Sequence, residues 1–476
     1  MNVKECVSMI SLGCPKNLVD TEVMLGSLIE EGYRISQREE EAEVIIVNTC
    51  GFIEEAKKES IETILELAEL KKNGNCRILV VAGCLPQRYK DDLIEELPEV
   101  DLFIGTGEFQ KVVEILDRFK RSTNPPRRYI DEPRFIYSDK TPRLNTYGVS
   151  SAYVKIAEGC SNSCSYCVIG KIRGRFRSRS LHSIVREVEN LVKMGVKEIN
   201  IIGQDTTQYG RDLSPTTNLG ELLRELAKVK ELEWIRILYT HPAYFTEDLV
   251  QVIKEEEKIC NYIDLPVQHI NDRMLKAMNR KTTGSLIRKL IEKLRREVPG
   301  ICIRTSLIVG FPGETDEEFE ELLEFVKEVK FDRLGAFEYS REEGTLASSY
   351  PGQIREGIKK ERYMRLMEVQ KGIALENNQK IIGSSIKVLT EGVSEENGLV
   401  KGRTPYQAPE IDGVTYITQG KAGAGQIHDV FIADADEYDL IGKISSPISS
   451  SVKYFNPQNR RYYSSGFALS DRTNPT

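Results

Sequence analysis

Short apolar runs alternate with longer polar stretches in the first part of the chain. The runs lie at 7–12, 44–47 and 78–82, and the stretches between them are rich in residues that favour helices. Strands that alternate with helices usually pair in parallel. The pattern therefore predicts an amino-terminal α/β domain built on a parallel sheet.

A second alternating series follows a proline-rich break. Four prolines between residues 121 and 149 interrupt any regular element, so this segment is predicted to be a linker. Six strands and intervening helices predict a partial βα barrel, whose chemistry belongs to the loops at the carboxyl ends of the strands. The strands are expected at 153–157, 198–202, 234–239, 262–265, 302–309 and 333–339, and the clearest helices at 181–194, 219–228, 316–329 and 354–380.

The last part of the chain changes to short β runs broken by glycine and proline. Runs at 386–389, 414–417 and 430–433 predict a small β-barrel. Residues 383–444 carry ten acidic side chains against five basic ones, which suits a basic protein partner better than nucleic acid. A serine-rich, mostly disordered tail is expected at the end. The predicted boundaries are 1–120, 121–149 for the linker, 150–380, 381–444 and 445–476.

Composition narrows the class of protein. With 476 residues, 40% hydrophobic and 29% charged, the chain is typical of a globular protein of about three domains. No apolar run approaches the roughly 18 residues that cross a bilayer, and no charged-then-apolar leader precedes the first strand. We therefore expect a cytoplasmic protein with no membrane partner. Its ten cysteines should stay reduced and are candidates for metal binding or catalysis.

Six of these cysteines form two sets of three. Cys14, Cys50 and Cys84 each follow one of the first three apolar runs, where ligands bind in open α/β sheets. Three separate buried thiols are the alternative. Cys160, Cys164 and Cys167 form a C-x-x-x-C-x-x-C loop after the first barrel strand, for which the alternative is a zinc knuckle. Iron–sulfur clusters usually take four thiolates, so each set predicts a cluster with one open iron.

The tight cysteine motif resembles that of the radical S-adenosylmethionine superfamily, and both sets together resemble its methylthiotransferases. The stretches SLGCPKNLVD at 11–20, EYSREEGT at 338–345 and APEIDG at 408–413 are similar to the branch that modifies ribosomal protein S twelve. The tRNA-modifying relatives usually carry Gln-Met-Asn where this chain has Pro15-Lys16-Asn17. The resemblance covers about residues 5–444.

The resemblance implies a flavodoxin-like amino-terminal domain, a partial (β/α)6 TIM-type barrel and a TRAM barrel of the OB-like kind. It also implies two 4Fe-4S clusters: a radical one at Cys160 and an auxiliary one at Cys14 that carries the methylated sulfur. S-adenosylmethionine would supply the methyl group and the 5′-deoxyadenosyl radical that removes hydrogen from the β-carbon of an aspartate. We also expect a monomer that receives electrons from a donor such as flavodoxin or ferredoxin. It would act on its substrate protein in the context of the ribosome.

Several residues are expected to bind S-adenosylmethionine, and each has a structural alternative. Gly203, Gln204 and Asp205 follow the second barrel strand, where Asp205 would accept from the amine; the alternative is an ordinary turn. Gly310, Pro312 and Gly313 follow the fifth strand, where the glycines would otherwise only shape the turn. Tyr166 is expected near the adenine, or else fills space.

Other conspicuous residues carry weaker expectations. Five basic residues at every second position share one side if their segment is extended, and one or two are expected at the cluster or cofactor; the alternative is a solvated face. The histidines form no ligand pattern, and His241 is expected to be structural. The basic residues are Lys171, Arg173, Arg175, Arg177 and Arg179, and the cysteines assigned to packing are Cys6, Cys76, Cys260 and Cys302.

Two other functions remain open from the sequence. One is a tRNA adenosine methylthiotransferase. The other is not enzymatic: an iron–sulfur carrier or ribosome-binding adaptor in which the barrel binds and the clusters are merely held.

Overall fold

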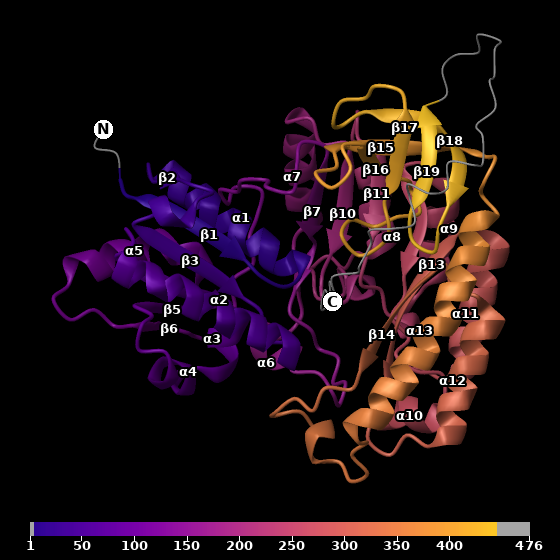
Figure 1. Cartoon of the computed structure of the whole chain (residues 1–476), viewed down its shortest axis with the longest axis horizontal. Helices are drawn as coiled ribbons and strands as arrows, with labels where there is room; N and C mark the ends of the chain where they lie inside the picture. Colours follow the sequence, from indigo (N-terminus) through magenta and orange to yellow (C-terminus); the bar gives the residue numbers. More distant parts are fainter. Residues whose placement is uncertain (1–3, 445–476) are drawn as a thin grey trace.

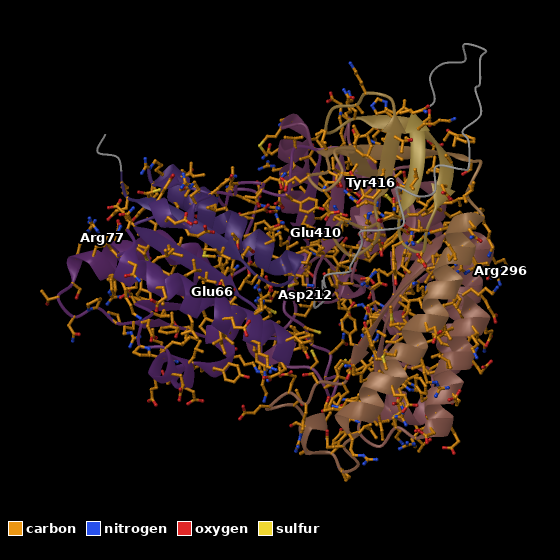
Figure 2. All side chains as sticks on the ribbon, in the orientation of Figure 1. Glu66, Arg77, Asp212, Arg296, Glu410 and Tyr416 are labelled. Atoms are coloured by element: carbon orange, nitrogen blue, oxygen red, sulfur yellow. The ribbon has the colours of Figure 1, made fainter. Side chains whose placement is uncertain are left out.

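The computed structural model describes residues 4–444, which fold as an amino-terminal α/β domain, a central α/β domain and a small barrel (Figure 1). The amino-terminal domain and the central domain lie side by side, and the barrel covers one end of the central domain (Figure 1). Arg77 and Arg296 mark the opposite ends of the molecule (Figure 2). The predicted disordered tail, 445–476, lies outside the described residues.

The amino-terminal domain is built on a six-stranded parallel sheet in the order β2-β1-β3-β4-β5-β6. This is the flavodoxin-like order, as predicted. Its strands are β1 (Cys6–Ser11), β2 (Arg34–Ile35), β3 (Val44–Thr49), β4 (Ile78–Gly83), β5 (Leu102–Gly105) and β6 (Arg128–Tyr129). Its helices are α1 (Pro15–Glu30), α2 (Glu54–Asn73), α3 (Cys84–Tyr89), α4 (Asp91–Glu96) and α5 (Val112–Arg121), with 3₁₀ turns η1 (Glu39–Glu41) and η2 (Phe109–Lys111).

Both faces of this sheet are buried because successive residues of a strand point to opposite sides. On β3, Val44 and Ile46 pack with one group of helices, whereas Ile45 and Val47 pack with the other. The first group includes α1 and α5, and the second includes α2 and α4. The apolar runs therefore read as continuous in the sequence.

The segment between the two α/β domains is more regular than the sequence predicted. Part of it forms β6, which pairs with β5 and extends the first sheet. Further along, Arg143 donates to Glu22 of α1 (2.6 Å) and to Glu187 of the central domain (2.5 Å). The segment thus ties the two domains together through a buried guanidinium, although proline interrupts long elements within it.

The central domain contains a six-stranded parallel sheet in the order β14-β13-β12-β11-β10-β7, and within residues 4–444 its two edge strands do not pair. This open barrel confirms the predicted fold. Its main strands are β7 (Ser151–Lys155), β10 (Glu198–Ile202), β11 (Trp234–Ile237), β12 (Ile259–Asp264), β13 (Cys302–Val309) and β14 (Arg333–Glu338), joined by the short antiparallel pair β8 (Ala157–Glu158) and β9 (Arg177–Ser178). Its helices are α6 (Ile169–Arg173), α7 (Leu181–Lys193), α8 (Leu219–Ala227), α9 (Glu247–Glu255), α10 (Asp272–Ala277), α11 (Gly284–Glu297), α12 (Asp316–Val329) and α13 (Glu356–Gln379), with 3₁₀ turns η3 (Thr206–Gln208), η4 (Pro242–Tyr244) and η5 (Ala347–Ser349).

The carboxyl-terminal part is a closed five-stranded barrel in the order β15-β16-β17-β19-β18. Glu198 of β10 holds it against the central sheet, because this buried carboxylate pairs with Arg403 of the barrel and with Arg236 of β11. The barrel strands are β15 (Ser385–Val393), β16 (Val400–Arg403), β17 (Thr415–Gln419), β18 (Ile427–Ala435) and β19 (Leu440–Ile444). Over residues 4–444, no helix is both long enough and apolar enough to cross a membrane.

Candidate active site between the two α/β domains

The three widely spaced cysteines follow the ends of three adjacent strands. Cys14 precedes α1 just after β1, Cys50 follows β3 directly, and Cys84 begins α3 after β4. The carboxyl ends of neighbouring parallel strands share one edge of the sheet. Gly13, at φ +86°, shows how close these loops are: a Cβ there would come within 2.7 Å of the Cys50 Cβ. The first cysteine set therefore gathers at one edge.

Arg173 reaches this edge from the central domain. It is the last residue of α6, and its buried guanidinium donates to Cys84 Sγ (3.4 Å), to Asp20 Oδ2 (2.5 Å) and to Asn17. The sequence did not predict this contact, because 156 residues separate Arg173 from Asn17. A cationic side chain of the central domain thus contacts a thiol of the first cysteine set.

The thiols of this set differ in how readily they ionise. Burial opposes ionisation of Cys14, but Lys16 and Arg173 lower its pKa below the ordinary value. Burial raises the pKa of Cys50 and of Cys84. Metal binding deprotonates a thiol outright, so a soft cation would be needed to hold all three as thiolates.

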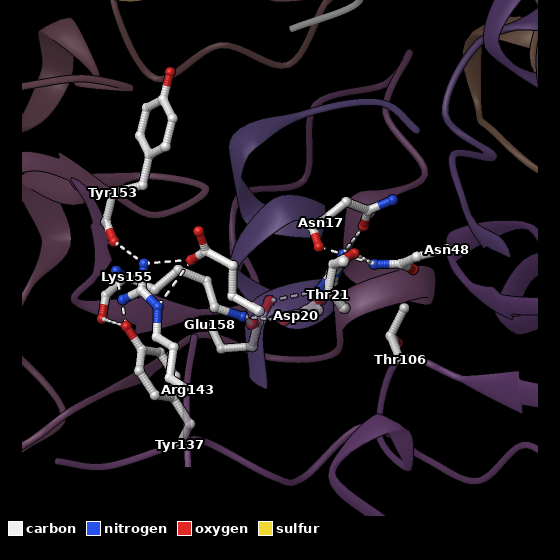
Figure 3. Close-up of polar contacts among 12 residues, drawn as sticks. Asn17, Asp20, Thr21, Asn48, Thr106, Tyr137, Arg143, Tyr153, Lys155 and Glu158 are labelled. Carbon is white, nitrogen blue, oxygen red and sulfur yellow. Dashed lines mark hydrogen bonds and ion pairs between the residues drawn. The ribbon is translucent and has the colours of Figure 1, made fainter. Parts of the chain in front are cut away.

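A buried ion network joins the two domains beside these cysteines. Lys155 of β7 donates to Asp20 of α1 (2.5 Å) and to Glu158 of β8 (2.6 Å), as Figure 3 shows. Arg173 lies 3.6 Å from the same Glu158 carboxylate. Burial opposes ionisation of Glu158, but Lys155 and Arg173 lower its pKa to about 2. Two buried cations therefore share two buried carboxylates across the domain junction.

The second cysteine set lies in the loop that follows β8. Several contacts hold this loop: Ser165 donates through its backbone to Met278 (3.0 Å), and Asn279 donates to the Ser163 carbonyl (2.7 Å). Arg280 lies 3.9 Å from Cys164 Sγ. Burial raises the pKa of Cys160 to about 11, and it also raises the pKa of Cys167.

The side chains at each cysteine set are of the chemical type that binds iron–sulfur clusters. Each set consists of three thiols with a guanidinium beside it, Arg173 at Cys84 and Arg280 at Cys164. Soft thiolates with a compensating cation suit a soft, anionic group. Within residues 4–444, no three His, Cys, Asp or Glu side chains meet as ligands of a single metal ion would. A four-iron cluster makes a different demand, because each of its three thiolates binds a different iron.

The residues expected after the second barrel strand lie beside the cysteine loop. Asp205 accepts hydrogen bonds from Asn162 of that loop (2.8 Å), from Thr207 (2.5 Å) and from Gln208 (2.6 Å). Gln204 donates to Glu158 (2.9 Å). Gly203 precedes them directly after β10. Asp205 is 2% exposed, and its hydrogen bond with Asn162 helps to order the cysteine loop. Its contact with a cofactor amine stays a prediction.

A buried carboxylate, Glu314, holds the loop that follows β13. Glu314 accepts from the Gly310 backbone N–H (2.7 Å) and from Arg362 (2.5 Å), and it lies 3.1 Å from His269. Gly310 itself, at φ +72°, approaches Lys359 so closely that a Cβ would come within 2.5 Å of Lys359 Cγ. Packing against Lys359 therefore explains why a glycine is needed at position 310. The cofactor role of Gly310, Pro312 and Gly313 stays a prediction.

Tyr166 belongs to the cysteine loop, between Cys164 and Cys167. It contacts a small apolar cluster that includes Met274, Phe311 and Tyr339. Burial raises its pKa well above the ordinary value. This packing accounts for the aromatic residue, and a role near an adenine is untested.

The five alternating basic residues do not share one face, because their segment is not extended throughout. Lys171 and Arg173 lie on helix α6, whereas Arg177 lies on β9. Lys171 donates to the Gly344 carbonyl (2.7 Å), and Arg179 donates to Glu187 (2.5 Å). Of these residues, Arg173 contacts a cysteine of the predicted sites.

The remaining histidines and cysteines behave mostly as expected. His241 accepts from the Ala243 backbone N–H (3.2 Å), and burial lowers its pKa to about 2, which supports a structural role. His269, for which no partner was predicted, lies against Glu314. The four cysteines assigned to packing are all buried: Cys6, Cys76, Cys260 and Cys302.

Comparison with family models gives the class of the protein. The radical SAM superfamily model matches residues 154–326, an uncharacterized protein family, UPF0004, matches residues 6–105, and the TRAM domain matches residues 382–444. The solved structure of the radical S-adenosylmethionine methyltransferase TsrM from Kitasatospora setae shares the fold, with a TM-score of 0.53 and 17% identity over 80% of this chain and 79% of that one. The family models thus give the class of a radical S-adenosylmethionine enzyme with a carboxyl-terminal TRAM domain.

Curated relatives identify the family. The ribosomal protein uS12 methylthiotransferase RimO of Geobacter sulfurreducens is 54% identical over 94% of this chain and 100% of its own length. The enzyme of the same name from Desulforamulus reducens is 50% identical over 92% of this chain and 99% of its own length. The chain belongs to the RimO family of methylthiotransferases.

Proposed function

We propose that this enzyme adds a methylthio group to the β-carbon of an aspartate in small-subunit ribosomal protein uS12. The printed names of its relatives state that substrate protein. The observation that carries the proposal is the junction of the two α/β domains, where Arg173 of the central domain contacts Cys84 of the amino-terminal set. A radical generated at one set and a sulfur held at the other would have to meet there.

The six cysteines are proposed to hold two 4Fe-4S clusters. Cys14, Cys50 and Cys84 would hold the auxiliary one. Cys160, Cys164 and Cys167 would hold the radical one. When bound, the clusters and S-adenosylmethionine would supply the methylated sulfur and the radical that removes hydrogen from an unactivated C–H bond, which general base catalysis cannot do.

The chain's own residues would bind, orient and shield these groups. Asp205 would fix the loop that carries the second cysteine set, because Asn162 of that loop donates to it at 2.8 Å. Arg173 would compensate the negative charge of the auxiliary thiolates from the other domain. Five residues would line the S-adenosylmethionine site, with Tyr166 near the adenine: Gly203, Gln204, Gly310, Pro312 and Gly313.

The charge of the barrel favours a basic protein over RNA as the partner. Its exposed acidic side chains include Glu395, Glu396, Asp429 and Asp434, whereas its exposed basic ones are Lys387 and Lys421. RNA binding depends on neutralising phosphates with basic side chains. We therefore propose that the barrel docks onto the ribosomal protein, in the context of the ribosome.

The remaining partners and boundaries are proposals of the same kind. The enzyme would act as a cytoplasmic monomer that receives electrons from a flavodoxin or ferredoxin. Its domains would comprise 1–120, 150–380 and 381–444, with 121–149 as the connection.

A product-mass comparison tests this function. Reconstituted enzyme is incubated with S-adenosylmethionine, a reductant and either uS12 or tRNA, and both products are weighed. Gain of one methylthio group in place of one hydrogen on uS12 alone supports the proposal. The same gain on tRNA alone would establish the tRNA enzyme instead, and failure to form 5′-deoxyadenosine would favour the carrier or adaptor.

A further inference from the structure

Lys16 is a buried cation without a carboxylate partner among residues 4–444. Three lysines among residues 4–444 are buried: Lys16, Lys155 and Lys359. Lys155 pairs with two carboxylates, and Lys359 pairs with Glu356. Lys16, which is 7% exposed, forms no ion pair within the part of the chain that the structure describes. A buried ammonium of this kind is costly unless an anion reaches it.

The position of Lys16 in its helix adds to that cost. It lies in the first turn of α1, two residues after Cys14. The amino end of a helix carries partial positive charge, so a cation there is unfavourable and an anion is favourable. The neighbouring cation Arg173 is already committed to Asp20 (2.5 Å). Both features indicate that an anion completes the site.

Lys16 also faces the carboxyl end of the central sheet. Its Nζ lies 3.2 Å from the centroid of the Tyr239 ring, and Tyr239 follows β11 by two residues. Tyr239 adopts φ +58°, a left-handed conformation that costs a bulky residue energy. Its backbone N–H donates to Asp264 (2.9 Å), and its carbonyl accepts from Thr206 (3.0 Å). The surroundings thus hold Tyr239 against Lys16, at the place where chemistry belongs in a βα barrel.

We infer that Lys16 binds the side-chain carboxylate of the substrate aspartate and thereby selects an acidic acceptor residue. This inference rests on the proposed function. The carboxylate would supply the missing anion next to Cys14, so the β-carbon beside it would be held close to the first cysteine set. An ammonium that reads a carboxylate rejects the uncharged amide, because the amide leaves the buried cation unpaired.

The test compares two acceptors and two enzymes. The acceptors are uS12 and uS12 whose target aspartate is changed to asparagine, which keeps the β-carbon and its hydrogens. The enzymes are the wild type and Lys16→Met, which keeps the unbranched shape without the charge. Lys16→Arg, which restores a cation, and Lys58→Met, which removes an exposed lysine from the same domain, are the matched controls.

Wild-type enzyme should prefer the aspartate acceptor, and Lys16→Met should lose about 10- to 100-fold in kcat/KM on it, the range of one charged hydrogen bond. Its kcat/KM on the asparagine acceptor should fall by less, so that the preference for aspartate over asparagine shrinks. Lys16→Arg should recover part of the loss, and Lys58→Met should match the wild type. The midpoint potential of the auxiliary cluster, measured in each variant, separately reports the effect of Lys16 on Cys14, whose pKa it lowers.

Two results would overturn the inference, and they differ from each other. An unchanged preference for aspartate in Lys16→Met, with a shifted potential, would mean that Lys16 serves the cluster instead of the substrate. Absence of any methylthio product on uS12 from wild-type enzyme would refute the proposed function itself.

Discussion

The interdomain ion network makes a quantitative prediction about Asp20. This carboxylate, 2% exposed, accepts from Lys155 of β7 and from Arg173 of α6, each at 2.5 Å. In Asp20→Asn the two cations keep Glu158, which lies 2.6 Å from Lys155 and 3.6 Å from Arg173. Removing one partner of a buried pair costs about 3 to 5 kcal/mol, and the remaining carboxylate favours the lower value, about 3 kcal/mol.

The effect is measured by thermal unfolding. At about 2.1 cal/mol/K for each residue, a chain of this size that unfolds cooperatively would lose roughly 3 °C of its midpoint, and an amino-terminal domain that unfolds alone would lose more. The matched control is Asp101→Asn, because Asp101 pairs with Lys71 at 2.6 Å but both side chains are 24% exposed. That partly exposed pair should contribute less than the buried Asp20 network, about 1 kcal/mol. Equal midpoints for Asp20→Asn and Asp101→Asn would refute the argument that burial makes the Asp20 network important.

Three further predictions follow from the two cysteine sets and the barrel interface. Replacing Cys14, Cys50 and Cys84 with Ala should lower iron from about eight to about four per chain; an unchanged iron count would show that the auxiliary site lies elsewhere. Gly13→Ala places a Cβ 2.7 Å from the Cys50 Cβ at φ +86° and should lower auxiliary cluster content while the iron at the second cysteine set stays; full occupancy by colorimetric iron analysis would contradict this. Two buried arginines lower the Glu198 pKa from 4.5 to about 2, so Glu198 contributes about 3 kcal/mol of stability above pH 4.5 that is lost as pH falls toward 2. In denaturant titrations, Glu198→Gln should have a lower free energy of unfolding than the wild type at neutral pH, and that free energy should depend less on pH between 4.5 and 2. Parallel plots of unfolding free energy against pH for the two proteins would refute this prediction.

Features with local signals could be predicted from the sequence. Each apolar run becomes a strand, and the cysteine after each run lies at the same sheet edge because neighbouring parallel strands end together. The strands β2 and β6 were missed because two residues give no periodic pattern. The barrel strands β16 and β19 were missed as well, since both are short and contain glycine.

The contacts that complete the site had no local signal. Arg173 was one of five alternating basic residues, and the sequence did not indicate which of them reaches a cysteine; the short helix α6 directs it toward Cys84. Lys16 and Tyr239 meet across more than 200 residues, so neither sequence position indicates the other. Such partners depend on how two domains dock, and periodicity within one segment does not report docking.

The central claim is that the two cysteine sets have different roles in one reaction. It is tested by measuring 5′-deoxyadenosine and methylthiolated uS12 separately in two variants, one with the first set changed to Ala and one with the second. The first variant should form 5′-deoxyadenosine and no methylthiolated uS12, and the second should form neither. Methylthiolated uS12 from the first variant, or 5′-deoxyadenosine from the second, would contradict the account.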